Sequence, residues 1–196
     1  MPVAIPTNTR RILVLGIGNI LWADEGFGVR AVEEFHRRYV VSDNVTVLDG
    51  GTQGLYLVNF LGEADCLIVF DAIDYGLRPG QLKLVRGGDV PKFTAVKKLS
   101  LHQIGFQEVL SAASLLGCCP RELALIGCQP LHLEDWGGPL TTPVCAQIAP
   151  AIELACELLA QWGAPPKLRA GPLPASERLL ANDIDQVNYE MKVRPI

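Results

Sequence analysis

Short runs of consecutive apolar residues alternate along this chain with longer stretches in which apolar and polar positions mix. Continuous apolar runs are typical of strands buried on both faces of a sheet, and mixed stretches with a helical period are typical of helices with one buried side. The runs predict strands at 12–17, 45–48, 66–70, 81–86 and 124–127, and the mixed stretches predict helices at 25–39, 55–61, 101–116 and 147–162. The run at 81–86 is less apolar than the others, so we expect it at a sheet edge, running antiparallel.

This alternation of strands and helices predicts an α/β fold, a single-domain three-layer sandwich with a mainly parallel sheet flanked by helices. A length of 196 residues is typical of one domain with a core of ordinary size. We expect the domain to occupy residues 1–163. Residues 164–196 contain several prolines and mixed charges, which predict an extended C-terminal arm, either mobile or docked.

The charge, the apolar runs and the cysteines of the chain limit the kinds of partner and the cellular compartment that we expect. The formal net charge of −4 gives no general attraction to nucleic acid or to anionic membranes, but it is compatible with a protein partner or a cation. No uninterrupted apolar run reaches the roughly 20 residues of a membrane span, and the N-terminal residues lack the pattern of a secretion signal. The six cysteines include no Cys-x-x-Cys pair. These features predict a cytoplasmic protein with reduced thiols and no membrane insertion.

The turn after the first predicted strand resembles a dinucleotide-binding loop only in part. Gly16 and Gly18 have the right spacing, but Leu21 stands where the third glycine belongs. The acids Asp24 and Glu25 then follow near the expected helix start, where they would repel a pyrophosphate. The two glycines are therefore better explained as positions where the backbone needs a tight turn.

Acidic residues follow three of the predicted strands. Glu25, Asp49 and Asp71 would meet at one edge of a parallel sheet, where their like charges repel unless they share a cation or a proton. Each acid taken singly is also explained as a helix or turn cap. His102, at the start of the helix predicted at 101–116, would add an imidazole for a divalent metal, or would simply cap that helix.

A second group of polar residues lies in Cys128–Asp135, after the strand at 124–127. It mixes soft and hard metal ligands, including His132, but its spacing matches no established site. We expect this loop to shape the rim of a cleft instead. The chain has no Gly-x-Ser-x-Gly elbow and no cysteine with a histidine base nearby in sequence, so a Ser or Cys nucleophile is poorly supported.

Four separated blocks of the chain form a recognisable set: GIGNILWADEGFGVR at 16–30, DGGTQG at 49–54, DAIDYGLRPG at 71–80 and SLHQ at 100–103. Their sequences and their order resemble the hydrogenase maturation endopeptidases, and most closely those that serve membrane-bound uptake hydrogenases. The resemblance extends from about Arg11 to Gly163, nearly the whole of the predicted globular domain. It leaves the C-terminal arm without a motif.

The resemblance implies a twisted, mainly parallel sheet between helices, and it implies proteolytic activity. These proteases remove the C-terminal extension of the [NiFe]-hydrogenase large-subunit precursor once nickel has been inserted, and the precursor supplies the nickel. Glu25, Asp71 and His102 occupy the family's metal-binding and catalytic positions, with all three residue types intact. Asp49 is expected to shape the substrate cleft. A non-catalytic nickel-checking or chaperone-like binder of the precursor is the main alternative, and a nucleotide-binding oxidoreductase is a weaker one.

Overall fold

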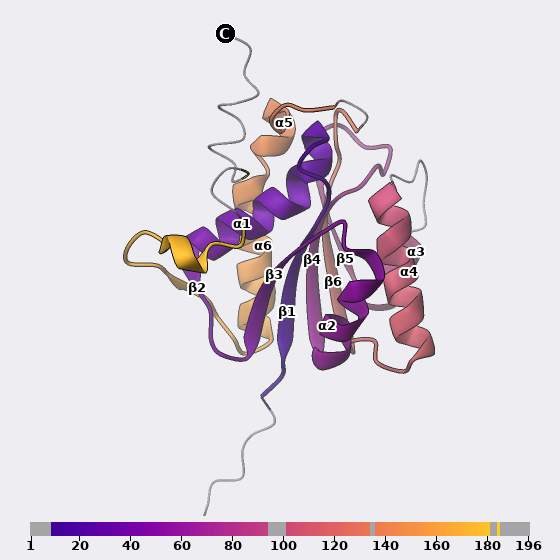
Figure 1. The fold of residues 1–196 in the computed structure, drawn as a ribbon, viewed down its shortest axis with the longest axis vertical. Coiled ribbons are helices and arrows are strands. Elements are labelled where there is room, and N and C mark those ends of the chain that lie inside the picture. Colours follow the sequence, from indigo (N-terminus) through magenta and orange to yellow (C-terminus); the bar gives the residue numbers. More distant parts are fainter. Residues whose placement is uncertain (1–8, 94–100, 134–135, 181–183, 185–196) are drawn as a thin grey trace, which may run out of the picture.

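A five-stranded sheet forms the centre of the molecule (Figure 1). The computed structural model describes residues 9–93, 101–133, 136–180 and 184. The strands are β1 (Ile12–Ile17), β3 (Val45–Gly51), β4 (Cys66–Ala72), β5 (Leu82–Arg86) and β6 (Glu122–Cys128), in the spatial order β3-β1-β4-β6-β5. All neighbours are parallel except β5, which pairs antiparallel with β6 at the edge. The predicted antiparallel edge strand is therefore confirmed.

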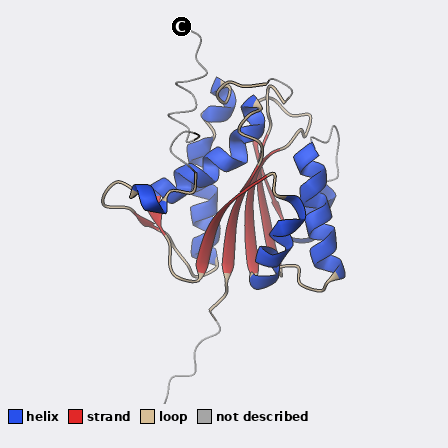
Figure 2. Cartoon of the chain, in the orientation of Figure 1, coloured by secondary structure: helices blue, strands red, loops and turns tan. Residues whose placement is uncertain are grey.

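Helices cover both faces of the sheet, which gives the three layers that the sequence predicts (Figure 2). On one face lie α1 (Phe27–Arg38) and α6 (Ile148–Gln161), which also contact each other. On the other lie α2 (Leu57–Glu63) and α4 (Leu101–Leu115). The shorter helices are η1 (Ala23–Gly26), η2 (Gly54–Tyr56), η3 (Gly87–Asp89), α3 (Val90–Phe93), α5 (Thr142–Cys145) and η4 (Ala175–Glu177).

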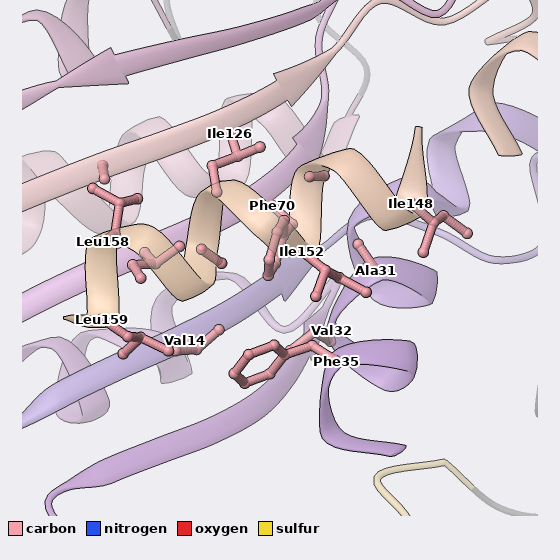
Figure 3. Packing of buried hydrophobic residues seen from close by; sticks show 14 of the residues in the cluster. Val14, Ala31, Val32, Phe35, Phe70, Ile126, Ile148, Ile152, Leu158 and Leu159 are labelled. Atoms are coloured by element: carbon pink, nitrogen blue, oxygen red, sulfur yellow. The ribbon is translucent and has the colours of Figure 1, made fainter. Parts of the chain in front are cut away.

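Successive strand residues point to opposite faces, and this divides the core into two clusters. On one side Val14 and Phe70 pack with Phe35 of α1 and with α6 (Figure 3). On the other, Leu13 packs in a cluster with Leu61 of α2 and with α4. Because β1 and β4 are buried on both faces, their sequences are continuous apolar runs, and the bounds predicted for β1 are confirmed.

The described part of the C-terminal arm lies against α1. A short strand, β7 (Lys167–Leu168), pairs antiparallel with β2 (Tyr39–Val40), which directly follows α1. The amide of Arg169 donates to the carbonyl oxygen of Arg38 at 2.8 Å. Leu180, near the end of the described arm, is buried. These residues of the arm are therefore docked, one of the two alternatives that the sequence leaves open.

One helical stretch in the described residues, Thr142–Gln161, is long and apolar enough to cross a membrane by length and composition alone. Its α6 part contributes Ile148, Ile152 and Leu159 to the core beside α1. A core helix of a globular protein has the same composition, so this stretch is weak support for a membrane span.

Candidate functional site

The strand order places a topological switch point between β1 and β4. From β1 the chain passes through α1 to β3 on one side, and then returns through α2 to β4 on the other side of β1. In open α/β sheets ligands bind in the crevice at the carboxyl ends of the strands where the direction of winding reverses. The turn after β1 carries Glu25, and β4 carries Asp71. Both predicted carboxylates therefore lie at this edge.

Glu25 belongs to the 3₁₀ turn η1, and α1 begins two residues later than predicted, at Phe27. Backbone hydrogen bonds close the turn: the amide of Glu25 donates to the Trp22 carbonyl at 2.8 Å, and the Asn19 amide donates to the Glu25 carbonyl at 3.2 Å. Gly18 has a φ of +142°, and a Cβ there would lie 1.9 Å from the Glu25 carbonyl oxygen. The prediction that this glycine serves the backbone is confirmed.

A second close approach brings the start of α1 onto the sheet. A Cβ on Gly28 would lie 2.2 Å from the carbonyl oxygens of both Ile17 and Phe70. Only glycine allows the helix to pass this close to the ends of β1 and β4. The η1 turn consequently contacts β4, the strand that carries Asp71.

Asp71 and Glu25 are both buried carboxylates. Asp71 is 1% exposed and is the next-to-last residue of β4, while Glu25 is 8% exposed. Charged groups this deep in a protein are stable only with polar or ionic partners. Two carboxylates supply hard oxygen donors, which suit a divalent cation, and they leave room in its coordination for other ligands.

Asp49 lies on β3, on the other side of β1 from β4. This strand extends beyond the predicted end at residue 48, and Asp49 pairs with Gly16 of β1. Its Oδ1 accepts a hydrogen bond from the Gly51 amide at 2.8 Å. Burial raises the pKa of the Asp49 carboxyl, against the opposing effects of the Gly51 hydrogen bond and the positive charge of Arg30. This carboxyl thus lies at the same edge as Asp71, with β1 between their two strands.

His102 is the second residue of α4, and the predicted helix is confirmed apart from its last residue. Because α4 leads into the amino end of β6, it starts near the carboxyl ends of the strands. The side chain of His102 lies outside the part of the structure that is described. Among the described side chains, no three His, Cys, Asp or Glu residues are grouped so as to hold a metal ion.

Asp24, the neighbour of Glu25, fastens the loop after β6 to the η1 turn. Its Oδ2 accepts hydrogen bonds from the amides of Leu131 (2.8 Å) and His132 (3.0 Å) and from the Thr141 hydroxyl (2.9 Å). Its Oδ1 accepts one from the Thr141 amide at 2.7 Å. No local pattern singles out Asp24, because its partners lie 107 to 117 residues away.

Buried Gln129 organises the adjacent loop after β4. Its Oε1 accepts hydrogen bonds from the amides of Tyr75 (2.8 Å) and Leu77 (3.1 Å), and its Nε2 donates to Asp74 Oδ1 at 3.0 Å. Burial and the nearby negative charge of Asp24 raise the pKa of Cys128 to about 12. This thiol stays protonated at neutral pH and does not provide a nucleophile.

The loop after β6 also carries exposed apolar side chains. Leu131 is 47% exposed and Trp136 is 70% exposed. The ring of Trp136 meets that of Trp22 edge to face, with 5.3 Å between centroids. Leu21, in the same turn as Trp22, is 39% exposed. These side chains form an apolar rim on the loop and the turn.

Comparison with known proteins agrees with this architecture. The family described as hydrogenase maturation protease matches residues 29–158. The hydrogenase expression/formation protein HupD of Bradyrhizobium diazoefficiens is 74% identical over 190 residues, covering 96% of this chain and 99% of the relative. The Escherichia coli hydrogenase 2 maturation protease is 44% identical over 154 residues, covering 78% of this chain and 93% of the relative.

The fold has a counterpart among solved structures. The hydrogenase maturating endopeptidase HybD from Escherichia coli superposes with a TM-score of 0.77 at 42% identity, covering 82% of this chain and 98% of that one. The similarity extends over the sheet and its helices, so the predicted fold and the resemblance read from the four sequence blocks are confirmed. This chain belongs to the hydrogenase maturation protease family.

Proposed function

We propose that this protein is a cytoplasmic endopeptidase that removes the C-terminal extension of a [NiFe]-hydrogenase large-subunit precursor after nickel insertion. The observation that carries the proposal is the pair of buried carboxylates, Glu25 and Asp71, at the switch point of a fold shared with HybD. Membership of the maturation protease family supports peptide-bond hydrolysis as the reaction. The precursor is the macromolecular partner.

In this proposal Glu25, Asp71 and His102 engage the nickel that the precursor carries. Two carboxylates and one imidazole suit a borderline divalent ion, and a set without thiolate favours release of the processed subunit. The nickel belongs to the substrate, so its binding reports that insertion is complete. When present, it acts as a Lewis acid toward the scissile carbonyl or toward water. A carboxylate of the set serves as the base that receives the water proton.

The precursor's extension has to lie across this edge of the sheet in an extended form. The turn after Gly51 and the loop after β6 both follow strands whose carboxyl ends meet there. The exposed side chains of Leu131 and Trp136 offer apolar surface to such a peptide. In the proposed complex these two segments hold the peptide on either side of the carboxylates.

The first test is a processing assay on purified chain with nickel-loaded and nickel-free precursor, followed by mass measurement of the product. We expect the nickel-loaded precursor to be shortened and the nickel-free one to stay intact. Shortening separates a protease from a nickel-checking or chaperone-like binder, which would bind the precursor and leave its mass unchanged.

The second test replaces the proposed imidazole ligand. His102→Ala should leave the fold intact and abolish processing of nickel-loaded precursor, because the metal loses one of three ligands. The matched control is His36→Ala on α1, where the imidazole Nε2 lies 2.8 Å from the Glu177 carbonyl oxygen of the arm, away from the switch point. It should process normally. Normal cleavage by the His102 variant would remove this residue from the site.

A further inference from the structure

We propose that Asp24 is a positioning residue that holds the described residues 131–133 and 136–141 of the loop after β6 in the geometry needed to bind the precursor peptide. The inference rests on the proposed function and gives a role to a residue that is not one of the proposed ligands. It concerns a single buried side chain whose hydrogen bonds all reach one distant segment. In this proposal Asp24 fixes the position of the loop and is not a ligand of the metal.

The carboxylate is well suited to fasten a loop. Asp24 is 0% exposed, and its two oxygens accept four hydrogen bonds from Leu131, His132 and Thr141. Hydrogen bonds to an ionised acceptor are shorter and stronger than neutral ones, and these measure 2.7 to 3.0 Å. A neutral amide at this position would turn an NH₂ group toward N–H donors, so the arrangement specifically requires an acidic side chain.

The turn that carries Asp24 does not depend on these bonds. The amides of Glu25 and Asn19 close it through backbone hydrogen bonds, and Gly18 lets the chain pack against itself there. The loop is different, because the amides of Leu131 and His132 donate to the Asp24 carboxylate instead of to the backbone. Loss of the carboxylate should therefore loosen the loop and leave the backbone around Glu25 closed.

The loop that Asp24 holds carries exposed apolar side chains beside the proposed site. Leu131 and Trp136 are exposed, and Trp136 contacts Trp22 beside the site. One further backbone bond, from the Gly137 amide to the Leu21 carbonyl at 2.7 Å, ties the same loop to the same turn. An apolar rim fixed in advance binds an extended peptide with a smaller loss of conformational entropy than a mobile one.

The structural test compares Asp24→Asn with the unaltered chain. We expect the near-UV circular dichroism of the Trp22–Trp136 pair to weaken and the amides of Leu131, His132 and Thr141 to exchange faster. Thr141→Val removes only the hydroxyl bond and should give a smaller change in the same direction. Asp65→Asn, which removes a carboxylate at the opposite end of the sheet, is the control and should change neither signal.

The functional test measures precursor affinity as well as cleavage. Asp24→Asn should weaken binding of nickel-loaded precursor and raise KM by about tenfold or more, with kcat much less affected. Thr141→Val should show a smaller rise and keeps the measurement available if the Asp24 variant does not fold. A lower kcat at unchanged KM, or loop signals identical to those of the unaltered chain, would overturn the proposal.

The two hypotheses fail in distinguishable ways. If the unaltered chain binds the precursor without shortening it, the proposed protease function fails, while the change in affinity still tests Asp24. If it cleaves the precursor and Asp24→Asn binds as tightly as before, the positioning role fails alone. If it neither binds nor cleaves, both are wrong.

Discussion

Two irregular segments of this molecule are fastened to the folded core by charged side chains, and they are fastened differently. The loop after β6 is held by Asp24, a fully buried carboxylate whose four hydrogen bonds are 2.7 to 3.0 Å long. The C-terminal arm is held in part by Arg169, whose Nη2 donates to the carbonyls of His36 and Tyr39 at 3.5 and 3.4 Å. The Asp24 bonds are short and buried, whereas the side-chain bonds of Arg169 are long. The arm is also held by two shorter bonds, from the Arg169 amide to the Arg38 carbonyl at 2.8 Å and from Arg30 Nη1 to the Ile184 carbonyl at 3.0 Å.

The η1 turn and the C-terminal arm also differ in how closely they pack against the rest of the protein. The η1 turn, the start of α1 and the ends of β1 and β4 approach one another so closely that glycines are required. The arm and α1 instead leave a cavity of about 580 Å³ between them, lined on its two sides by residues such as Arg37 and Leu173. The ion pair between Arg169 and Glu177 measures 3.7 Å, and the Glu177 side chain is 55% exposed. Around this cavity the described part of the arm is therefore packed less tightly against α1 than the η1 turn is against the sheet.

The loop after β6 borders the proposed site, whereas the arm does not. The family match covers residues 29–158, which include this loop and exclude both the arm and the η1 turn. A site that holds a peptide against reacting groups needs supports that do not yield, since small displacements there reduce rates strongly. An arm on the far end of α1 has no such requirement. The difference indicates which parts of the molecule tolerate change.

Paired glycine substitutions give the largest expected contrast. Gly18→Ala places a Cβ 1.9 Å from the Glu25 carbonyl at a φ of +142°, so it should lower the free energy of unfolding by about 3 kcal/mol. It should also abolish processing by displacing Glu25. Gly171→Ala in the arm places its Cβ in open space and should change stability by less than about 0.5 kcal/mol. Urea denaturation of both variants measures these effects.

Equal losses of stability in the two glycine variants would contradict the division between a rigid edge and a tolerant arm. Activity provides the second criterion, because the Gly171 variant should process precursor at the rate of the unaltered chain. If the Gly18 variant unfolds at the same urea concentration as the unaltered chain, the turn can relax around the added methyl group.

Loosening the arm should have an intermediate effect. Arg169→Ala removes the Nη2 hydrogen bonds and the ion pair to Glu177, which are long or exposed, so we expect a loss of about 1 kcal/mol. Hydrogen exchange should rise in β7 and β2 and stay unchanged in β1 and β4. Processing should continue at the normal rate. A variant that exchanges faster throughout the sheet would show that the arm is part of the cooperative core.

Local patterns in the sequence were sufficient for the central elements. The bounds of β1 follow from one unbroken apolar run, and the edge position of β5 follows from its weaker hydrophobicity. The placement of Glu25 and Asp71 at one edge needed only the rule that parallel strands end together. These inferences succeed because a few neighbouring residues determine whether a strand is buried.

Features that depend on distant partners could not be predicted this way. In the sequence, Asp24 has no feature that separates its role from that of Glu25. Its role depends on hydrogen-bond partners in the loop after β6. The pairing of β2 with β7 joins segments of two residues each, too short to show any periodicity. The helix predicted at 25–39 includes the last two residues of the η1 turn, because a 3₁₀ turn and the first turn of an α-helix have similar sequences.

The smallest expected effect is the pH dependence of stability that comes from two acids, Asp49 at the sheet edge and Glu177 in the arm. Burial raises the pKa of Asp49 in the folded protein above its usual value, so the folded state holds this proton more tightly than the unfolded state does. The associated stability is present below the unfolded pKa and is lost as the pH rises through the folded pKa. Asp49→Asn keeps an oxygen for the Gly51 amide and removes the ionisation.

At neutral pH the Asp49→Asn variant should therefore be more stable than the unaltered chain, by about 1 kcal/mol or less, and the gain should vanish in acid. Glu177→Gln in the arm should show no such dependence, because a largely exposed ion pair contributes little at any pH. Urea denaturation at neutral and at acidic pH measures both variants. A loss of stability at neutral pH for the Asp49 variant would mean that the attraction to Arg30 and the hydrogen bond from Gly51 outweigh burial, so that this edge stabilises its carboxylates in the ionised form.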